Sequence, residues 1–506
     1  MLPFDARLVT ALPPMAWLYR MKVQSRPKLI HGRSVELLPD GFFEGCFSGK
    51  WLTCDFASCP DVFGSGLKTV GGVHHFVTPS HTLEGIFTLS RDGELAVSNS
   101  LCFLLEFHGA TLPVDLSYGS RFASAAWGID AYEKHLASTS AGHISWVLFD
   151  NLRVAEDLTT AHVRKPNGAP FTDYNSYVRL LKETVGSALA NASDPGRSVN
   201  YTPLTTCSSG YDSSAVSAIA SQLGCRTAIT LKTSREGAND SGLPVGQALG
   251  LEVIEAERTQ RVSSFEDVAE FLACGLGGED YCYRDFSPFL DGRALVTAFY
   301  GDHHWDMQSK PNEIVSRLDL CGGSLQEFRL QRNFIHIPVP IIGTRRHSQI
   351  FAISRMEEMM PYTLNNDYDR PIPRRIAEES GVPRELFGQE KKAASILLFL
   401  NPGLLQRAAL SSGERIAVDA GTRVKILLLI FFWNCRYLLY RLTDNRLTYK
   451  AESVFPLIKG LSTLFVKDMR IFEHEHPKAV LDFLGGLMLT RRRYSVAGNI
   501  HENAAQ

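Results

Sequence analysis

A run of small and hydroxylated residues around one aspartate is the segment best suited to chemistry in this sequence. It comprises Ser208, Ser209, Gly210, Tyr211, Asp212, Ser213 and Ser214. The run follows an extended segment and opens a helical pattern, so its N–H groups and the positive end of the helix would face outward. Such a turn suits pyrophosphate, and Asp212 could hold a hard cation that bridges phosphate oxygens. An ordinary capped turn, with Asp212 or Ser213 as N-cap, is the alternative.

The elements around this turn alternate between helices and strands. Helical patterns cover 177–189, 213–223 and 243–249, and extended segments cover 199–206, 226–231 and 251–256. This alternation predicts an α/β domain whose parallel sheet has covered faces, and such sheets bind ligands at the carboxyl ends of their strands. Pro203 conflicts with the first strand, because proline cannot donate to a sheet ladder.

The remaining chain reads differently on either side of this region. Short β-like pieces, separated by turn signals, cover 49–52, 73–78, 82–89, 94–97 and 144–149. After about residue 260 the chain reads as mostly helical, with a last helix near 479–489. We therefore expect a β-rich domain at 1–170, a parallel-sheet domain at 171–400 and a helical region at 401–506.

Composition narrows the class of protein. The 506 residues are 44% hydrophobic and 21% charged, which excludes a disordered, collagen-like or coiled-coil chain and suggests two to four domains. Because 52 Lys and Arg nearly balance 54 Asp and Glu, no basic excess points to a nucleic-acid partner. The ten cysteines form no C-x-x-C pair, which is typical of reduced, buried thiols.

Targeting signals are not evident in the sequence. The first residues lack a basic segment followed by an apolar one, and the longest apolar run, 426–433, is far shorter than the roughly 20 residues of a spanning helix. We expect a cytoplasmic protein with at most peripheral membrane contact. The apolar stretch 424–441 is either a buried core helix or a helix that contacts a membrane surface or a partner.

The 208–214 run resembles the S-G-G-x-D-S loop of N-type (PP-loop) ATP pyrophosphatases, and within that group the chain resembles the asparagine synthetase family. Ser209 stands where the loop has its first glycine. The segment 297–305, T-A-F-Y-G-D-H-H-W, is similar to the family's T-G-x-G-x-D-E-L-F: it keeps Asp302, loses both glycines and has His303 in place of glutamate. The resemblance implies that Asp212 and Asp302 together bind Mg²⁺.

Two later segments extend the resemblance to about residue 395. Residues 335–340 are similar to the family's V-E-x-R-x-P, with His336 replacing glutamate, and this residue either reshapes the acceptor side of the site or has a structural role. Residues 370–392 resemble K-x-L-L-R … L-P-x-x-V … K. The resemblance implies that the closing lysine, best matched by Lys391 with Lys392 one position on, neutralises phosphate charge. We expect the adenine near Leu231, at the end of the next strand.

Other candidate groups leave alternatives open. Glu358, beside Glu357, could deprotonate an attacking amine or lie on a solvated helix face. Residues 302–306, D-H-H-W-D, also look like a zinc or iron cluster. Adjacent histidines project differently, however, and no H-x-x-x-H spacing accompanies them.

The resemblance implies a ligase that uses ATP and Mg²⁺. It would adenylate a carboxylate or amide oxygen, release pyrophosphate, and transfer the acyl group to an amine, forming an amide, lactam or amidine. The acceptor would be a small molecule, a peptide or a sugar, or ammonia from a partner protein. Catalytically degenerate nucleotide binding, scaffolding and metal-dependent hydrolysis are the alternatives.

The N-terminal domain bears on the nitrogen source. Family members that use glutamine begin their mature chain with a cysteine, whereas this sequence has Leu2 and its first cysteine is Cys46. The resemblance therefore predicts a degenerate, Ntn-like α+β domain without glutaminase activity, as in relatives that form lactams or macrolactams. Nitrogen would then come from ammonia or from an amine of the substrate.

Overall fold

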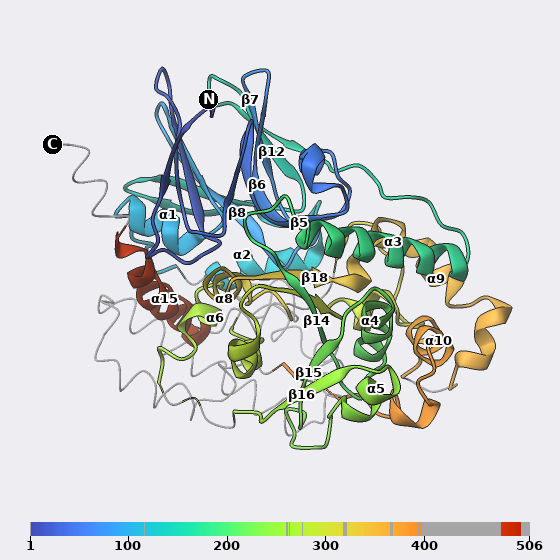
Figure 1. Cartoon of the computed structure of the whole chain (residues 1–506). Helices are drawn as coiled ribbons and strands as arrows, with labels where there is room; N and C mark the ends of the chain where they lie inside the picture. The colour runs from blue at the N-terminus through green and yellow to red at the C-terminus, as the bar shows by residue number, and fades with distance from the viewer. Residues whose placement is uncertain are drawn as a thin grey trace, which may run out of the picture.

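The computed structural model describes residues 2–395, apart from gaps at 116, 260–261, 263, 276, 317–320, 365–367 and 393, and residues 477–496. The expected helix at 424–441, and most of the expected region 401–506, lie outside these residues. Figure 1 shows a β-sandwich of two sheets that holds the N-terminus and, below it, a further sheet covered by helices.

The sandwich consists of two sheets. One has the strand order β1 (Asp5–Leu8), β3 (Lys28–His31), β2 (Trp17–Lys22), β9 (Glu94–Ser98), β8 (Gly85–Arg91), β11 (Gly142–Leu148), β10 (His135–Thr139). The other has the order β13 (Thr160–Val163), β12 (Asn151–Val154), β7 (Val73–Val77), β6 (Val62–Val70), β5 (Gly41–Phe47), β4 (Glu36–Leu38). Strand neighbours are antiparallel except for β1 and β3, which run parallel.

Alternation along the strands builds two apolar layers in the sandwich. In β2, Trp17 and Tyr19 face the second sheet, where they contact Phe42 and Phe76, while Leu18 faces the opposite side. That opposite side is covered by α1 (Leu101–Phe107), α2 (Tyr118–Ala123) and α15 (Pro477–Arg491). Of the predicted β pieces, 49–52 is wrong, because the chain there forms a 3-10 turn; the others fall on β7, β8, β9 and β11.

The third sheet of the molecule, outside the sandwich, is parallel. Its order is β16 (Glu252–Ala256), β15 (Thr227–Leu231), β14 (Thr202–Thr206), β17 (Arg293–Thr297), β18 (Phe334–Pro338). The predicted parallel sheet is thus confirmed, as are its first three strands. The expectation of a mostly helical chain after residue 260 is wrong for β17 and β18, because a five-residue apolar run carries no period that separates strand from helix.

Pro203 lies within β14 without costing a ladder hydrogen bond. Alternate residues of the strand address opposite neighbours: Thr202 N–H donates to Gly292, and Cys207 N–H donates to Ile229 of β15. Pro203 has the parity of Cys207, so its nitrogen faces the β15 side. Pairing with β15 begins only at Thr205, so no partner carbonyl is left unsatisfied there.

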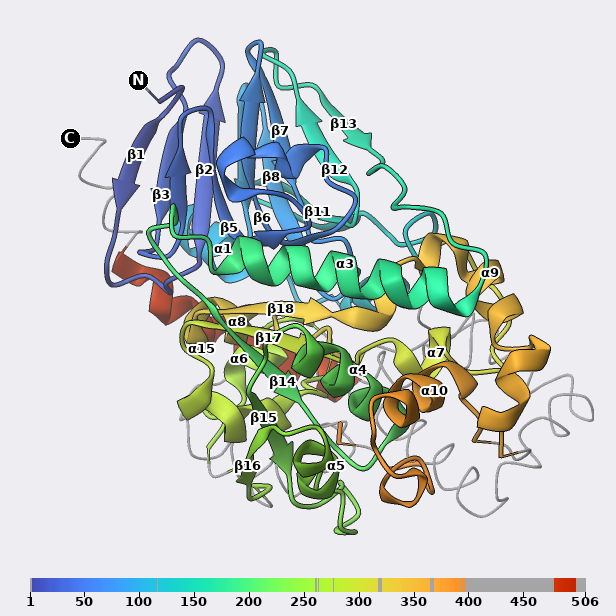
Figure 2. The same ribbon diagram turned by 45° about the vertical axis from the view of Figure 1, so that its right-hand side comes forward.

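Helices cover both faces of the parallel sheet. On one face lie α3 (Tyr174–Ala192) and α4 (Tyr211–Gln222), and on the other α6 (Ala269–Leu272) and α8 (Gln326–Arg332). Asp173 and Ser176 form a reciprocal capping box that starts α3. Figure 2 shows α3 lying between the sandwich and the parallel sheet. The remaining helices are α5 (Leu243–Ala248), α7 (Gly301–His304), α9 (His347–Ile353) and α10 (Pro371–Glu379).

A buried ion cluster joins the two parts of the molecule. Arg329 of α8 donates to Glu84 at 2.6 Å and, through its two terminal nitrogens, to Glu44 of β5 at 2.8 and 3.1 Å. All three side chains are at most 3% exposed. Burial opposes the charged form of Glu84, but the Arg329 charge and the nearby ring of His336, 3.7 Å away, lower its pKa to about 2. The cluster therefore fixes the sandwich onto the sheet domain with charged groups.

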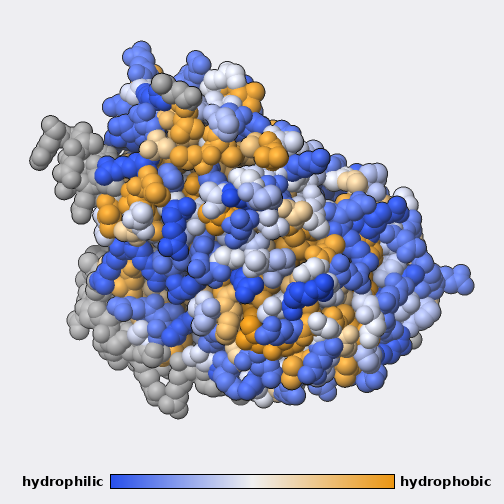
Figure 3. Space-filling model, in the orientation of Figure 1, coloured by the Kyte–Doolittle hydropathy of each residue, from blue (hydrophilic) through white to orange (hydrophobic). Residues whose placement is uncertain are grey.

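The outer surface mixes hydrophilic and apolar residues. On the face drawn in Figure 3, apolar residues are visible both on the sandwich and on the part that contains the parallel sheet, with hydrophilic residues between them. None of the helices in the described part of the chain has the length and apolar character needed to cross a bilayer.

Candidate nucleotide-binding site

The 208–214 turn lies where the order of the parallel strands reverses. β14 ends at Thr206 and α4 begins at Tyr211, so the turn follows the carboxyl end of the central strand. Strands β15 and β16 continue to one side of β14, and β17 and β18 to the other. This is the position at which an open parallel sheet binds its ligand. Gly210 is the N-cap, so neither Asp212 nor Ser213 takes that role.

Hydrogen bonds within the turn satisfy its first N–H groups. Ser208 N–H donates to the Ser213 hydroxyl, Gly210 N–H to the Ser208 hydroxyl, and Ser209 N–H to the Asp240 carbonyl. Tyr368 accepts from the N–H of Tyr211, and within the described residues the N–H groups of 212 and 213, in the first turn of α4, have no acceptor. The outward-facing donors expected from the sequence are thus those of the helix start rather than those of 208–210.

The structure brings Asp212 and Asp302 together, although they come from different segments. Asp302 belongs to α7, which follows β17, the strand beside β14. Gly301 lies so close to α4 that a Cβ atom there would be 2.6 Å from Cγ of Asp212. A residue without a side chain is therefore required at position 301 if the Asp212 carboxylate is to keep its place.

Arg370, at the N-terminus of α10, already neutralises part of this acidic pair. Its guanidinium forms an ion pair with Oδ2 of Asp212 and lies 3.5 Å from the carbonyl oxygen of Asp302. Burial and the charges of Asp302 and Asp306 raise the pKa of Asp212 to about 6, against the opposing effect of Arg370. The charge of Asp212 is thus costly in this surrounding, and a second cation would relieve that cost.

The residues present fit a magnesium ion. Mg²⁺ usually takes one or two protein carboxylates and completes its shell with water and phosphate oxygens. Oδ1 of Asp212 is buried and accepts no hydrogen bond from the described residues, and Asp302 is near enough for its charge to raise the pKa of Asp212. Since Arg370 contacts the other oxygen, Oδ1 is the atom of Asp212 that a cation would use.

Tyr300 has a backbone conformation that glycine usually adopts. The family pattern has a glycine at this position, and Tyr300 adopts a left-handed conformation with φ of 76°. A bulky residue in this conformation is strained by roughly 1–3 kcal/mol and needs its surroundings to hold it. Its hydroxyl contacts Thr82, accepting from the backbone N–H at 2.9 Å and lying 2.7 Å from Oγ1.

Tyr300→Phe should destabilise the fold by about 1–3 kcal/mol, because the buried N–H of Thr82 loses its acceptor. Chemical denaturation of the purified variant measures the loss. Thr82→Ala is the matched control: it removes the hydroxyl contact but leaves the N–H bonded to Tyr300, so it should cost less. Equal losses would show that the N–H bond does not hold Tyr300 in place.

The 370–392 segment closes over the turn from the other side. Arg374, fully buried on α10, donates to the Tyr211 hydroxyl at 2.6 Å, and Gly388 N–H donates to the Ser209 carbonyl at 2.8 Å. Lys392 Nζ lies 3.2 Å from Oγ of Ser209 and 2.8 Å from the carbonyl oxygen of Asn239. Lys391, the better match by sequence, is exposed. The lysine that reaches the turn is therefore Lys392.

Lys392→Ala should weaken binding of a nucleoside triphosphate about tenfold, because a positive charge beside the turn is removed. Lys391→Ala should change it by less than about twofold, as expected for an exposed lysine. Titration calorimetry of the two variants separates them. The reverse ranking would restore the role that the sequence assigns to Lys391.

Three other predicted site residues lie outside the turn. Leu231 ends β15 and is 8% exposed, at the same edge of the sheet. His336 is buried in the middle of β18, where Nε2 lies 2.8 Å from Oγ1 of Thr297, so it belongs to the junction with the sandwich. The Glu358 carboxylate accepts from Arg375 at 2.9 Å at an exposed position, and none of its hydrogen bonds reaches the turn.

The sandwich offers no reactive thiol at Cys46. This residue lies in β5 with no exposed area, and burial raises its pKa to about 12. A cavity of about 30 Å³ lies nearby at the junction, between the helices outside the sandwich and α8; Glu84, Gln326 and Glu327 are among its lining residues. It has room for a water or two, not for glutamine.

Some residues that shape the site had no signal in the sequence. Arg370 was part of a matched segment, but nothing indicated that it pairs with Asp212. Arg329 and its glutamates are 245 and 285 residues apart, a separation that no local pattern spans. His347 joins His303 and His304 only because β17 and β18 are neighbours.

A scan of protein-family models finds no match to this chain, and a search of curated proteins finds none either. The resemblance to asparagine synthetases therefore rests on the matched sequence motifs.

Proposed function

We propose that the protein is an asparagine synthetase-like ligase, which activates a carboxylate or an amide oxygen with ATP and transfers the acyl group to an amine. One observation carries the proposal. The 208–214 turn and Asp302 were matched to the family from separate parts of the sequence, and they lie together at the edge where the strand order reverses. Placement at that edge is what an ATP site in a parallel sheet requires.

The chain's own groups would act by placing the reactants and balancing phosphate charge. A substrate oxygen attacks the α-phosphorus of ATP, and the bond to the β-phosphate breaks. The N–H groups at the start of α4 would hold the departing pyrophosphate, with Lys392 beside it. Asp212 and Asp302 would hold Mg²⁺, which would supply further charge neutralisation. The amine then attacks the acyl carbon, and AMP leaves.

The amine would come from the acceptor substrate or from free ammonia. The buried thiol of Cys46 has a pKa of about 12, so it cannot supply a thiolate that would release ammonia from glutamine. We propose that the sandwich acts as a fixed support for the sheet domain, held by the Arg329 cluster. A small molecule, peptide or sugar that carries the amine, or a partner that delivers ammonia, completes the reaction.

Exchange of labelled pyrophosphate into ATP tests the reaction. The full-length protein is incubated with Mg²⁺ and a set of carboxylates that includes acidic amino acids, uronic acids and peptides. Carboxylate-dependent exchange, with AMP as the nucleotide product, is expected. Gly301→Ala should lose it, because the new Cβ would displace Asp212. Formation of ADP and phosphate would contradict adenylation.

A nucleotide-binding protein without turnover is the second candidate. It is favoured by the Arg370 ion pair, which occupies Oδ2 of Asp212, and by the internal bonding of the first N–H groups of the turn. This candidate predicts that ATP binds, that Arg370→Met tightens Mg²⁺ binding, and that no carboxylate supports exchange.

A further inference from the structure

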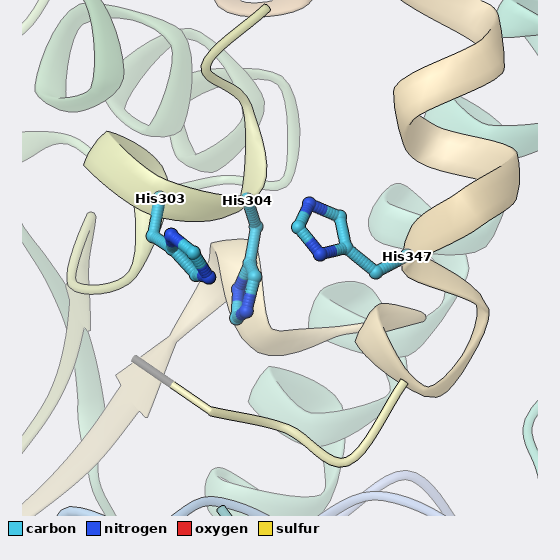
Figure 4. Close-up of side chains that lie close together, drawn as sticks. All are labelled: His303, His304 and His347. Atoms are coloured by element: carbon cyan, nitrogen blue, oxygen red, sulfur yellow. The ribbon is translucent and has the colours of Figure 1, made fainter. Parts of the chain in front are cut away.

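Three histidines gather beside the proposed nucleotide site without being part of it. His303 and His304 are in α7, and His347 begins α9. One ring nitrogen from each lies within 4.8 Å of the others. Figure 4 shows the rings of His303 and His304 side by side below α7, with the ring of His347 approaching from α9.

The topology of the sheet explains why the cluster forms. β17 and β18 are adjacent parallel strands, so the segments that follow them leave the same edge. The first gives α7 directly, and the second passes two 3-10 turns before it reaches α9. The ring centroids lie 5.0–5.5 Å apart, and Tyr300 stacks on His304 at 5.3 Å. The rings are therefore positioned by packed elements rather than by a loose loop.

The cluster is buried and includes an imidazole nitrogen without a partner. His347 has no exposed area, and His303, the most accessible of the three, is 9% exposed. Within the described residues, Nε2 of His347 makes no hydrogen bond. A neutral imidazole binds metals through such a nitrogen.

We propose that His303, His304 and His347 bind a first-row divalent metal ion of the zinc type. Neutral imidazoles suit Zn²⁺ and its neighbours, whereas Mg²⁺ prefers oxygen ligands. Tetrahedral binding at 2.0–2.1 Å needs nitrogens roughly 3.4 Å apart, so nitrogens that lie up to 4.8 Å apart must approach by up to about 1.4 Å when the ion binds. Three protein ligands leave the fourth position open, as in catalytic rather than closed structural sites. The site does not depend on the proposed ATP reaction.

Metal binding must also change one hydrogen bond. The N–H of Asn312 donates to Nδ1 of His347 at 3.1 Å. If Nδ1 binds the ion, its lone pair is used. If Nε2 binds, a neutral ring carries its proton on Nδ1. Either way the bond from Asn312 is lost, so hydrogen exchange at its amide should become faster when the metal binds.

Cobalt(II) alone, added to chelator-treated full-length protein, is the probe. We expect one equivalent to bind, with the visible spectrum of a nitrogen-ligated ion and without a thiolate charge-transfer band, and with faster exchange at Asn312. His347→Gln should weaken binding at least about tenfold. His31→Gln, which changes a buried histidine of the sandwich, should bind cobalt as wild type does.

A second variant keeps the test decisive if His347→Gln fails to fold. His347→Cys retains a ligand atom, so it should bind cobalt and add the thiolate band that the wild type lacks. Equal binding by wild type and His347→Gln, no binding by wild type, or a thiolate band already present in the wild type would each overturn the site.

Discussion

Asp302→Asn and Asp212→Asn should each lower carboxylate-dependent pyrophosphate exchange at least about hundredfold, which corresponds to ~2.7 kcal/mol of transition-state stabilisation. Each change removes one of the two carboxylates of the proposed cation site beside Gly301. The remaining carboxylate, partly neutralised by Arg370 where it is Asp212, would not hold both the cation and the phosphates. Exchange rates of the purified variants give the measurement.

The control for these variants is Asp130→Asn, an aspartate whose side chain is 52% exposed and pairs with Arg164 in the N-terminal part. It should keep wild-type exchange. Unfolding midpoints should show that all three variants fold. Near-normal exchange by Asp302→Asn would mean that the match of 297–305 to the family's segment is wrong.

Arg329→Met should destabilise the protein by about 3–5 kcal/mol, because it leaves Glu44 and Glu84 buried without a cation. The side chains have similar length, so the loss is mainly one of charge. Equilibrium denaturation, followed by the fluorescence of the buried tryptophans, measures it. Changing all three residues together, with Glu44→Gln and Glu84→Gln, should recover part of the lost stability, since no uncompensated charge then remains.

Arg164→Met provides the matched comparison for Arg329→Met. Arg164 is 38% exposed and also contacts two carboxylates, those of Asp130 and Asp150. Because Arg164 and Asp130 both reach solvent, its loss should cost only about 1 kcal/mol, although Asp150 is 8% exposed. A cost for Arg329→Met no larger than this would show that the buried cluster does not hold the two parts together.

The part of the fold that the sequence predicts is the part with strong local signals. The apolar stripe of α3 and the alternation of β14–β16 with helices are such signals, and both elements are predicted from them. The strands β17 and β18 are as long as β14–β16, but the chain around β17 forms short α-helical and 3-10 pieces that show no clear alternation of helix and strand, and both strands were missed. Most of the sandwich was missed for a related reason: strands such as β2 are buried on both faces and lack polar alternation.

In the candidate site, too, residues within contiguous motifs could be predicted, whereas pairings between distant segments could not. The turn and Asp302 follow from matched segments, because each depends on contiguous residues. Which lysine reaches the turn depends on how the chain approaches Gly388, and the sequence pointed to Lys391 where the structure places Lys392. The pairing of Arg370 with Asp212 joins residues 158 apart and could be found only in three dimensions.

The return of α15 to the sandwich has a consequence for biosynthesis. Phe483, Leu484 and Leu487 complete the apolar layer outside the first sheet, and Arg491 contacts Glu106, 385 residues earlier in the chain. At roughly 5–20 residues per second, a ribosome needs about 20–80 s to make the intervening chain. During that time the outer face of the nascent sandwich lacks α15, one of the three helices that cover it.

Such an exposed apolar face is a binding site for chaperones and a source of aggregation. Nascent chains stalled before residue 477 should therefore retain chaperones that release the finished protein. Messages that end early would yield products that are insoluble even though every strand of the sandwich has been made.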